Sequence, residues 1–392
     1  MDARLPARKL VRPRRWLSTL GAASLLACGD SGSLEEGMEP PSLIEACEPE
    51  AVEVLETESL IYRSYGRDFQ GICPGSFEAA QAHASWVEQI WGRPQVGDEV
   101  RLYASREEPC WPCTSGALAC VEERVAHALT VPHRHELTHL VRDRCPSLIE
   151  EGFASIYGRY FSYYETVDEI ENAITVSDEG ALPGTYYGIG GAFVAFLISR
   201  DGMESLHQLC DLDIPNTLSL AEGLEEVYQL PLNELIAEFE AAPGKGNAYL
   251  KQELACDALE AGAELEVFTS PSAWTMDMGC GAPGVEGGLG QYTMAQRLIE
   301  LPTDGPYALE MLADHDYRIQ VEVRHCEREN MASLLYATEF VPLVAEEPRE
   351  LIFDHLIAGT YVLRVRTDED SEGNNGPGQG ELAVGFSLDS WP

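Results

Sequence analysis

The run Val-Pro-His-Arg-His-Glu-Leu-Thr-His-Leu-Val at residues 131–141 decides which fold this chain is expected to adopt. It contains two histidines four positions apart, His135 and His139, with Glu136 directly after the first. Residues four apart lie on one face of an α-helix, so both imidazoles can bind one metal ion. Glu136 then projects beside that ion, where its carboxylate can accept a proton from bound water. The run therefore predicts a helix that carries two zinc ligands and a general base.

A second run, Leu-Ile-Glu-Glu-Gly-Phe-Ala at residues 148–154, follows after a short interval. It resembles the Trp-Leu-x-Glu-Gly-x-Ala segment of the gluzincin metallopeptidases, and the short interval is similar to that of compact bacterial (peptidase MA-like) members. The resemblance implies that Glu151 is the third Zn²⁺ ligand and that Glu150 points away. Two histidines and one glutamate leave a fourth tetrahedral position for water, as catalytic zinc requires. The metzincin pattern fits worse, because it needs glycine and a ligand where Arg142 and Cys145 stand.

A tyrosine further along the chain is a candidate second catalytic residue. Tyr187, Gly191 and Phe193 match a Tyr-x-x-small-Gly-small-Phe pattern that precedes an apolar helix in related bacterial gluzincin-like proteins. A tyrosine hydroxyl at this place could donate a hydrogen bond to the oxyanion of a tetrahedral intermediate. Alternatively, Tyr187 only packs, and the glycines allow two helices to approach closely.

Two further histidines lie near the motif. His133 stands two positions before His135, about 200° around a helix, and is expected to face away from the metal pair. It is interpreted as a helix-entry residue, with a role beside the metal as the alternative. His127 lies in a weakly alternating run that is typical of a strand, and is expected at the surface. In zincins, the strand before the metal helix is the edge along which substrate lies.

The amino terminus has the pattern of an export signal, predicted at 1–27. Basic residues precede a short apolar stretch at 16–27 that is too short to span a bilayer stably. Its end, Leu-Leu-Ala-Cys-Gly at 25–29, resembles a bacterial lipobox, which implies lipidation of Cys28. The alternative is an ordinary secretory signal cut near Ala27. Residues 28–46 are small, acidic and proline-containing, and predict a flexible tether.

Composition limits the partners. The 392 residues hold 26 Lys+Arg against 66 Asp+Glu, a net charge of −40. This argues against nucleic acid and against docking on anionic lipid through a basic surface. The expected partners are a protein or peptide substrate, and a membrane only through the lipid on Cys28.

The eleven cysteines become an even set of ten once Cys28 carries lipid, which suits disulfides in an oxidising compartment. Cys110, Cys113 and Cys120 cluster in a run rich in Pro and Gly, and a structural disulfide loop is favoured there. A redox Cys-x-x-Cys or a zinc site is the alternative. A four-cysteine zinc ribbon would need a second Cys-x-x-Cys, and the chain has none.

The chain divides into two predicted domains. Residues 47–245 are expected to form an α+β zincin-like catalytic domain, with strands at 59–65 and 99–104 and a helix over 76–91 that Ser76 caps. After a Pro/Gly-containing boundary at 243–246, residues 256–392 show short strands, including 350–353, 360–366 and 382–388, at the spacing of an all-β sandwich. The run at 358–365 resembles pre-peptidase C-terminal domains of secreted bacterial peptidases. The acidic run at 368–375 is read as a solvated loop rather than a calcium site.

These features together predict zinc-dependent hydrolysis of peptide bonds by a secreted or surface-anchored metallopeptidase. The alternative is a catalytically inactive zincin-like surface lipoprotein that acts as a binding module. Intact ligand positions and an intact Glu136 count against the alternative.

Overall fold

The fold is described from a computed structural model of the chain. The structure describes residues 50–69, 71–108, 110–113, 117–131, 133–141, 145–158, 170–214, 216–242, 267–269, 272–287, 293–313, 317–326, 338–343, 347–367 and 383–390. All of them belong to one unit, Leu43–Pro392. The predicted signal, the lipidation site Cys28, the tether, the boundary at 243–246 and the acidic run at 368–375 lie outside the described residues.

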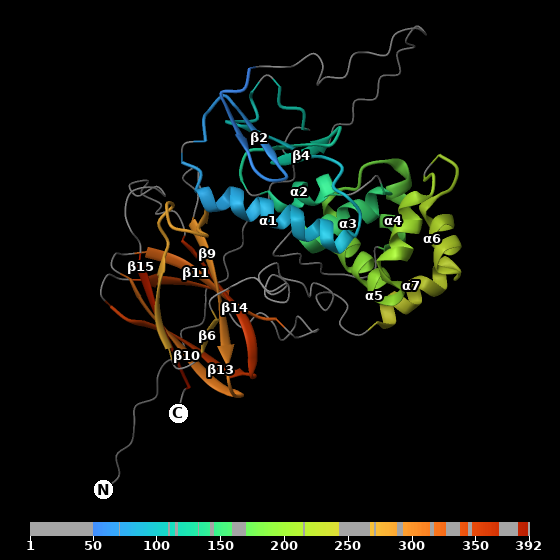
Figure 1. Cartoon of the computed structure of the whole chain (residues 1–392). Coiled ribbons are helices and arrows are strands. Elements are labelled where there is room, and N and C mark those ends of the chain that lie inside the picture. Colours follow the sequence, from blue (N-terminus) through green and yellow to red (C-terminus); the bar gives the residue numbers. More distant parts are fainter. Residues whose placement is uncertain are drawn as a thin grey trace, which may run out of the picture. The chain divides into compact units, whose positions relative to one another are not determined.

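A mixed sheet forms the first part of the α+β region (Figure 1). Among the described residues it has the order β1-β2-β3-β5-β4, with parallel pairing from β2 through β3 to β5 and antiparallel pairing at both edges. Strand burial alternates in β2 and β3, as expected for a sheet with one face on a core. The two strands predicted here are confirmed. The bounds are β1 (Glu53–Glu56), β2 (Ile61–Tyr65), β3 (Glu99–Tyr103), β4 (Ala119–Glu122) and β5 (Val125–Ala128).

Helices pack against this sheet and against one another (Figure 1). They are α1 (Pro74–Trp91), α2 (Arg134–Val141), α3 (Ser147–Gly158), α4 (Ile170–Glu179), η1 (Gly184–Tyr186), α5 (Tyr187–Asp211), α6 (Leu220–Tyr228) and α7 (Leu232–Ala241). The helix predicted over 76–91 is present but begins earlier, at Pro74, so Ser76 is not its N-cap. Proline suits the first helical position because it lacks the N–H that would have no partner there.

Glycines bring three helices unusually close together. A Cβ built on Gly152 of α3 would lie 2.5 Å from the backbone oxygen of Gly190 in α5. A Cβ on Gly158, at the end of α3, would lie 2.4 Å from the Cα of His135 in α2. Neither position has room for a side chain, so these glycines set how near α3 lies to its two neighbours.

Disulfides cross-link the described chain. Cys73 pairs with Cys280, Cys113 with Cys120, and Cys145 with Cys210, and Cys110 and Cys326 are also disulfide-bonded. Cys113 therefore joins Cys120 rather than Cys110, which fits the structural loop and not a redox Cys-x-x-Cys pair. Disulfides of this number are typical of proteins outside the cytoplasm, in agreement with the predicted export.

The C-terminal region is a β-sandwich, as predicted (Figure 1). In the described part of the chain, one sheet has the order β13-β10-β15-β7, and the other has the order β12-β11-β14-β9-β6, with β8 added on β9. Residues of both sheets share one apolar core that includes Tyr307, Val321 and Leu363. The strands are β6 (Val267–Thr269), β7 (Ser272–Asp277), β8 (Glu286–Gly287), β9 (Thr293–Leu301), β10 (Gly305–Ala313), β11 (Tyr317–His325), β12 (Thr338–Leu343), β13 (Arg349–Leu356), β14 (Gly359–Thr367) and β15 (Ala383–Ser390).

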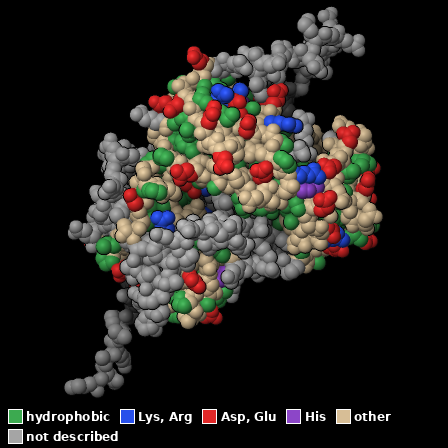
Figure 2. Space-filling model, viewed as in Figure 1, with side chains coloured by type: hydrophobic (Ala, Val, Ile, Leu, Met, Phe, Trp, Pro, Cys, Tyr) green, Lys and Arg blue, Asp and Glu red, His purple; other side chains and the backbone are tan. Residues whose placement is uncertain are grey.

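Two surface properties bear on partners. On the face that Figure 2 shows, Asp and Glu side chains are spread over the surface and Lys and Arg are few, as the net charge of −40 requires. Within the described ranges, none of the helices has both the length and the apolar character needed to cross a bilayer.

The close approach of α3 and α5 generates a stability prediction. Gly152→Ala places a methyl group against the backbone of Gly190, and we expect it to lower the free energy of unfolding by about 1–3 kcal/mol. Gly184→Ala is the matched control, because a Cβ there meets nothing within 4 Å. Its effect is expected to stay within about 0.5 kcal/mol. Urea unfolding measures both, and equal effects of the two substitutions would show that the helix contact is not tight.

Candidate metal centre

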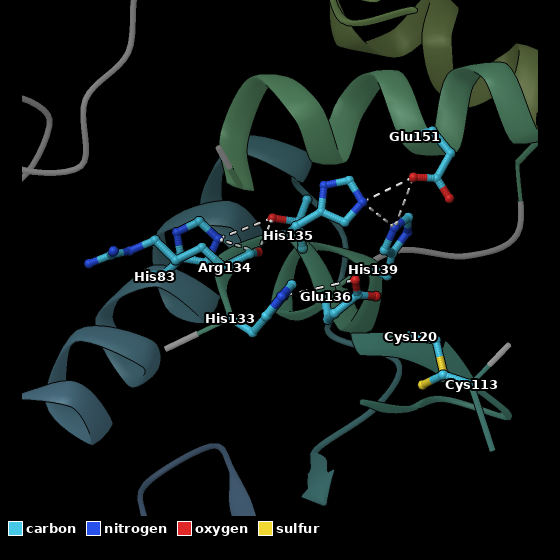
Figure 3. A network of polar contacts seen from close by, with 10 residues as sticks. His83, Cys113, Cys120, His133, Arg134, His135, Glu136, His139 and Glu151 are labelled. Atoms are coloured by element: carbon cyan, nitrogen blue, oxygen red, sulfur yellow. Dashed lines mark hydrogen bonds and ion pairs between the residues drawn. A yellow bond between two sulfur atoms is a disulfide. The ribbon is translucent and has the colours of Figure 1, made fainter. Parts of the chain in front are cut away.

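Three donor atoms from two helices converge on one point (Figure 3). Nε2 of His135 lies 3.0 Å from Oε2 of Glu151 and 3.3 Å from Nε2 of His139. Nε2 of His139 lies 3.6 Å from the same Glu151 oxygen. His135 is buried, and the other two side chains are partly buried. The structure thus brings together all three residues that the sequence and its resemblance proposed as ligands.

The spacing of these atoms fits a zinc ion. Zinc bound at about 2.0–2.1 Å by tetrahedral ligands separates neighbouring ligand atoms by about 3.3 Å. The three observed separations, 3.0, 3.3 and 3.6 Å, bracket that value. Two imidazole nitrogens and one carboxylate oxygen are also a donor set that Zn²⁺ commonly uses. His135, His139 and Glu151 therefore fit a zinc ion and leave one tetrahedral position for another ligand.

Glu151 is held as an anion. Its burial raises its pKa, but hydrogen bonds and charge from His135 and His139 lower it, and the net pKa lies well below the usual range. Glu150 faces elsewhere, since its Oε1 accepts a hydrogen bond from the backbone N–H of Cys145 at 3.0 Å. Cys145 is in turn fixed to Cys210 of α5 by a disulfide. The side chain of Glu151 thus points to the two histidines, whereas that of Glu150 points to the backbone of Cys145, as the resemblance implied.

Tyr187 lies directly beside the metal ligands. Its ring stacks on that of His135, with 5.5 Å between centroids and 13° between planes. The two readings of Tyr187, packing and catalysis, therefore share one location. The ring stacking on His135 supports the interpretation that Tyr187 packs. Because Tyr187 lies next to a candidate metal ligand, a catalytic role of its hydroxyl is also compatible with its position.

Glu136 and His133 lie close together at the start of α2. Glu136 is 7% exposed and, with His133 and Leu137, lines a small apolar pocket between α2 and the sheet. Nδ1 of His133 is 3.8 Å from Oε1 of Glu136. His133 directly precedes α2, as a helix-entry residue should, and it also contacts Glu136. Helix α2 begins at Arg134, so His133 does not follow helical spacing and its ring turns toward the first helical turn.

A histidine that the sequence reasoning did not single out supports the metal helix. His83 of α1 is fully buried, and its Nε2 contacts the carbonyl oxygen of Arg134 at 3.1 Å and Oγ1 of Thr138 at 3.0 Å. Burial and the nearby Arg134 charge lower the pKa of His83 to about 3, so the ring stays neutral at physiological pH. In the sequence, His83 is only a lone histidine on the buried side of a predicted helix, and that is a weak signal of a functional role.

His127 is buried, which contradicts its predicted surface position. It is 1% exposed, and its Nδ1 contacts the hydroxyl of Tyr103 at 3.0 Å. The reason is the strand order: β5, the strand before the metal helix, is paired on both sides by β3 and β4. The expectation that this strand is the sheet edge is therefore also wrong, and β4 takes that place among the described strands.

Comparisons with known proteins add little to this geometry. No protein-family model and no curated protein matches the chain. The pre-peptidase C-terminal domain of a collagenase from Bacillus anthracis is 11% identical, with a TM-score of 0.22 over 32% of this chain and 96% of that domain. A family 35 carbohydrate-binding module from Clostridium thermocellum is 14% identical, with a TM-score of 0.19 over 30% of this chain and 88% of the module. Scores this low support no conclusion, and the sandwich assignment rests on the sheets themselves.

The opposite directions of Glu150 and Glu151 yield a test of the ligand set. Glu151→Ala removes a donor, so we expect zinc affinity to fall by more than about 100-fold, beyond the usual effect of a residue that only supports ligands. Glu150→Ala keeps all three donors and should bind zinc as the wild type does. Competition with a chromophoric chelator measures both. Loss of zinc in Glu150→Ala with retention in Glu151→Ala would contradict the assignment.

Proposed function

We propose that this chain is a gluzincin-type zinc metallopeptidase that hydrolyses peptide bonds outside the cytoplasm. The observation that carries the proposal is the triangle of donors from His135, His139 and Glu151, with Glu136 on the same helix as the two histidines. A site with three protein ligands and one open position is what catalytic zinc uses, whereas structural zinc has four protein ligands.

When bound, zinc would lower the pKa of a water molecule and polarise the scissile carbonyl. Glu136 would accept the proton of that water and deliver it to the leaving amine. Its burial supports this role. The Glu136 side chain is 7% exposed and lines an apolar pocket, so few bulk water molecules can reach its carboxylate. The hydroxyl of Tyr187 would donate a hydrogen bond to the developing oxyanion.

The β4 edge of the mixed sheet is a candidate place for an extended peptide. Among the described strands, β4 pairs only with β5, so its other edge is not used by a neighbouring strand. An extended peptide can add to such an edge through its main-chain groups. The disulfide between Cys113 and Cys120 attaches Cys113 directly to β4. The proposed substrate is therefore a peptide or an extended segment of a protein.

Attachment to a membrane remains a proposal that rests on the lipobox-like run alone. The lipid on Cys28 would tether the chain to the bacterial cell envelope, with the acidic run at 28–46 as a spacer. An ordinary secretory signal would give the same metal centre without the tether.

Replacement of Glu136, the proposed general base, is expected to nearly abolish peptide cleavage without affecting zinc binding. Glu136→Gln keeps the size of the side chain but removes its ability to accept a proton, so cleavage of a peptide library should fall by about 10³-fold. Zinc content, measured by mass spectrometry, should stay at one equivalent. Zinc bound at one equivalent without any Glu136-dependent cleavage would contradict the peptidase and favour the inactive binding module.

A second substitution tests the role of Tyr187. Tyr187→Phe keeps the ring that stacks on His135 but removes the hydroxyl, so kcat should fall by about 10²-fold with little change in KM. Zinc affinity should be unchanged, because the stacked ring is retained. An unchanged kcat would show that Tyr187 acts only by packing on His135.

A further inference from the structure

A buried ion pair connects the start of the metal helix to the β-sandwich. Nη2 of Arg134 donates to both carboxylate oxygens of Glu286 in β8, at 2.8 and 2.6 Å. Both side chains are 7% exposed. A charge this deeply buried is stable only with its partner, so the pair fixes the two segments to each other in one geometry.

Several independent contacts join the same two segments. Cys73, directly before α1, forms a disulfide with Cys280. The hydroxyl of Ser76 donates to the carbonyl of Gly287 at 2.9 Å and accepts from its N–H at 2.8 Å. The N–H of Cys73 also donates to that carbonyl, at 3.0 Å. The segment at 280–287 is therefore fastened to α1 as well as to α2.

Arg134 transmits this attachment to the backbone of the first ligand. It is the first residue of α2 and directly precedes His135. Its side chain is held by Glu286, and its carbonyl oxygen accepts hydrogen bonds from Thr138 Oγ1 at 2.9 Å and from His83 Nε2 at 3.1 Å. The peptide between Arg134 and His135 is thus fixed from the sandwich on one side and from α1 on the other.

His135 needs such support more than most metal ligands do. A metal-binding histidine usually donates its outer ring N–H to a carboxylate or carbonyl, which fixes the ring orientation. Nδ1 of His135 is buried and has no hydrogen-bond partner among the described residues. The ring orientation therefore depends on contacts of the ring with Tyr187 and on placement of the backbone by Gly158 and Arg134.

We propose that Glu286 of the β-sandwich is a positioning residue of the metal centre, which acts on His135 through the guanidinium of Arg134. The sandwich is then a structural part of the site and not only an appended binding module. This inference rests on the proposed function only in requiring that His135, His139 and Glu151 bind zinc. Peptide cleavage does not enter its test.

The sandwich provides a matched control. Arg364 and Glu322 form an ion pair of similar burial on β14 and β11, at 2.8 Å and with side chains 6% and 4% exposed. Gln296 lies between the two pairs, since it contacts Glu286 at 3.2 Å and Arg364 at 3.3 Å. Glu322 pairs with Arg364 inside the sandwich, so its replacement disturbs the sandwich without removing the contact between Glu286 and Arg134.

The experiment compares Glu286→Gln and Glu322→Gln in the full chain. Zinc affinity is measured by chelator competition, and the ligand geometry by the visible spectrum of the cobalt(II)-substituted protein. We expect Glu286→Gln to weaken zinc binding by about 10-fold and to change the cobalt spectrum, as loss of a residue that supports a ligand does. Glu322→Gln should lower the melting temperature but keep the wild-type affinity and spectrum.

A double variant removes the ambiguity of a destabilised fold. Arg134→Met with Glu286→Leu replaces the ion pair by apolar contact, which often preserves stability. We expect it to melt near the wild-type temperature and still to show the altered cobalt spectrum. Wild-type affinity and spectrum in both Glu286→Gln and the double variant would overturn the positioning role, as would equal changes in Glu322→Gln. Failure of the wild type itself to bind zinc would instead overturn the metal site and the proposed function.

Discussion

The approach of α3 to α2 is the constraint on which the rest of the site depends. At Gly158, a Cβ would lie 2.4 Å from the Cα of His135, and a second glycine, Gly152, lets α5 come equally near from the other side. Only this short distance between helix axes allows a glutamate carboxylate to reach between two imidazoles four residues apart. The Cys145–Cys210 disulfide joins the residue two positions before α3 to α5, which helps to hold these two helices in one arrangement.

This arrangement brings three lone-pair donor atoms together at a site that is largely shielded from water. Two imidazole nitrogens and one carboxylate oxygen lie within 3.6 Å of one another. Such a group is stabilised by protons or by a cation, and separations near 3.3 Å match a tetrahedral zinc ion. The surrounding net charge of −40 also raises the local concentration of cations. Neighbouring elements thus hold the three donor atoms together, as the proposed zinc site requires.

The parts of the site that were predictable follow from local geometry. His135 and His139 were found because a spacing of four is enough to place two side chains on one helix face, and Glu151 was found only by resemblance to a known segment. The surface position expected for His127 is wrong, since the order of the strands depends on contacts between distant parts of the sequence. The roles of His83 and Glu286 could not be seen in the sequence, because they lie 51 and 152 positions from Arg134 and meet it only through the tertiary fold.

The central proposal is a zinc ion bound by two imidazoles and one carboxylate, with the C-terminal sandwich helping to position the first imidazole. X-ray absorption at the zinc edge of the loaded protein tests this most directly, because it reports the type and number of bound atoms. We predict four nitrogen or oxygen neighbours at about 2.0 Å, two of them with the outer-shell scattering of imidazole. A sulfur neighbour at about 2.3 Å, or a single imidazole, would contradict it.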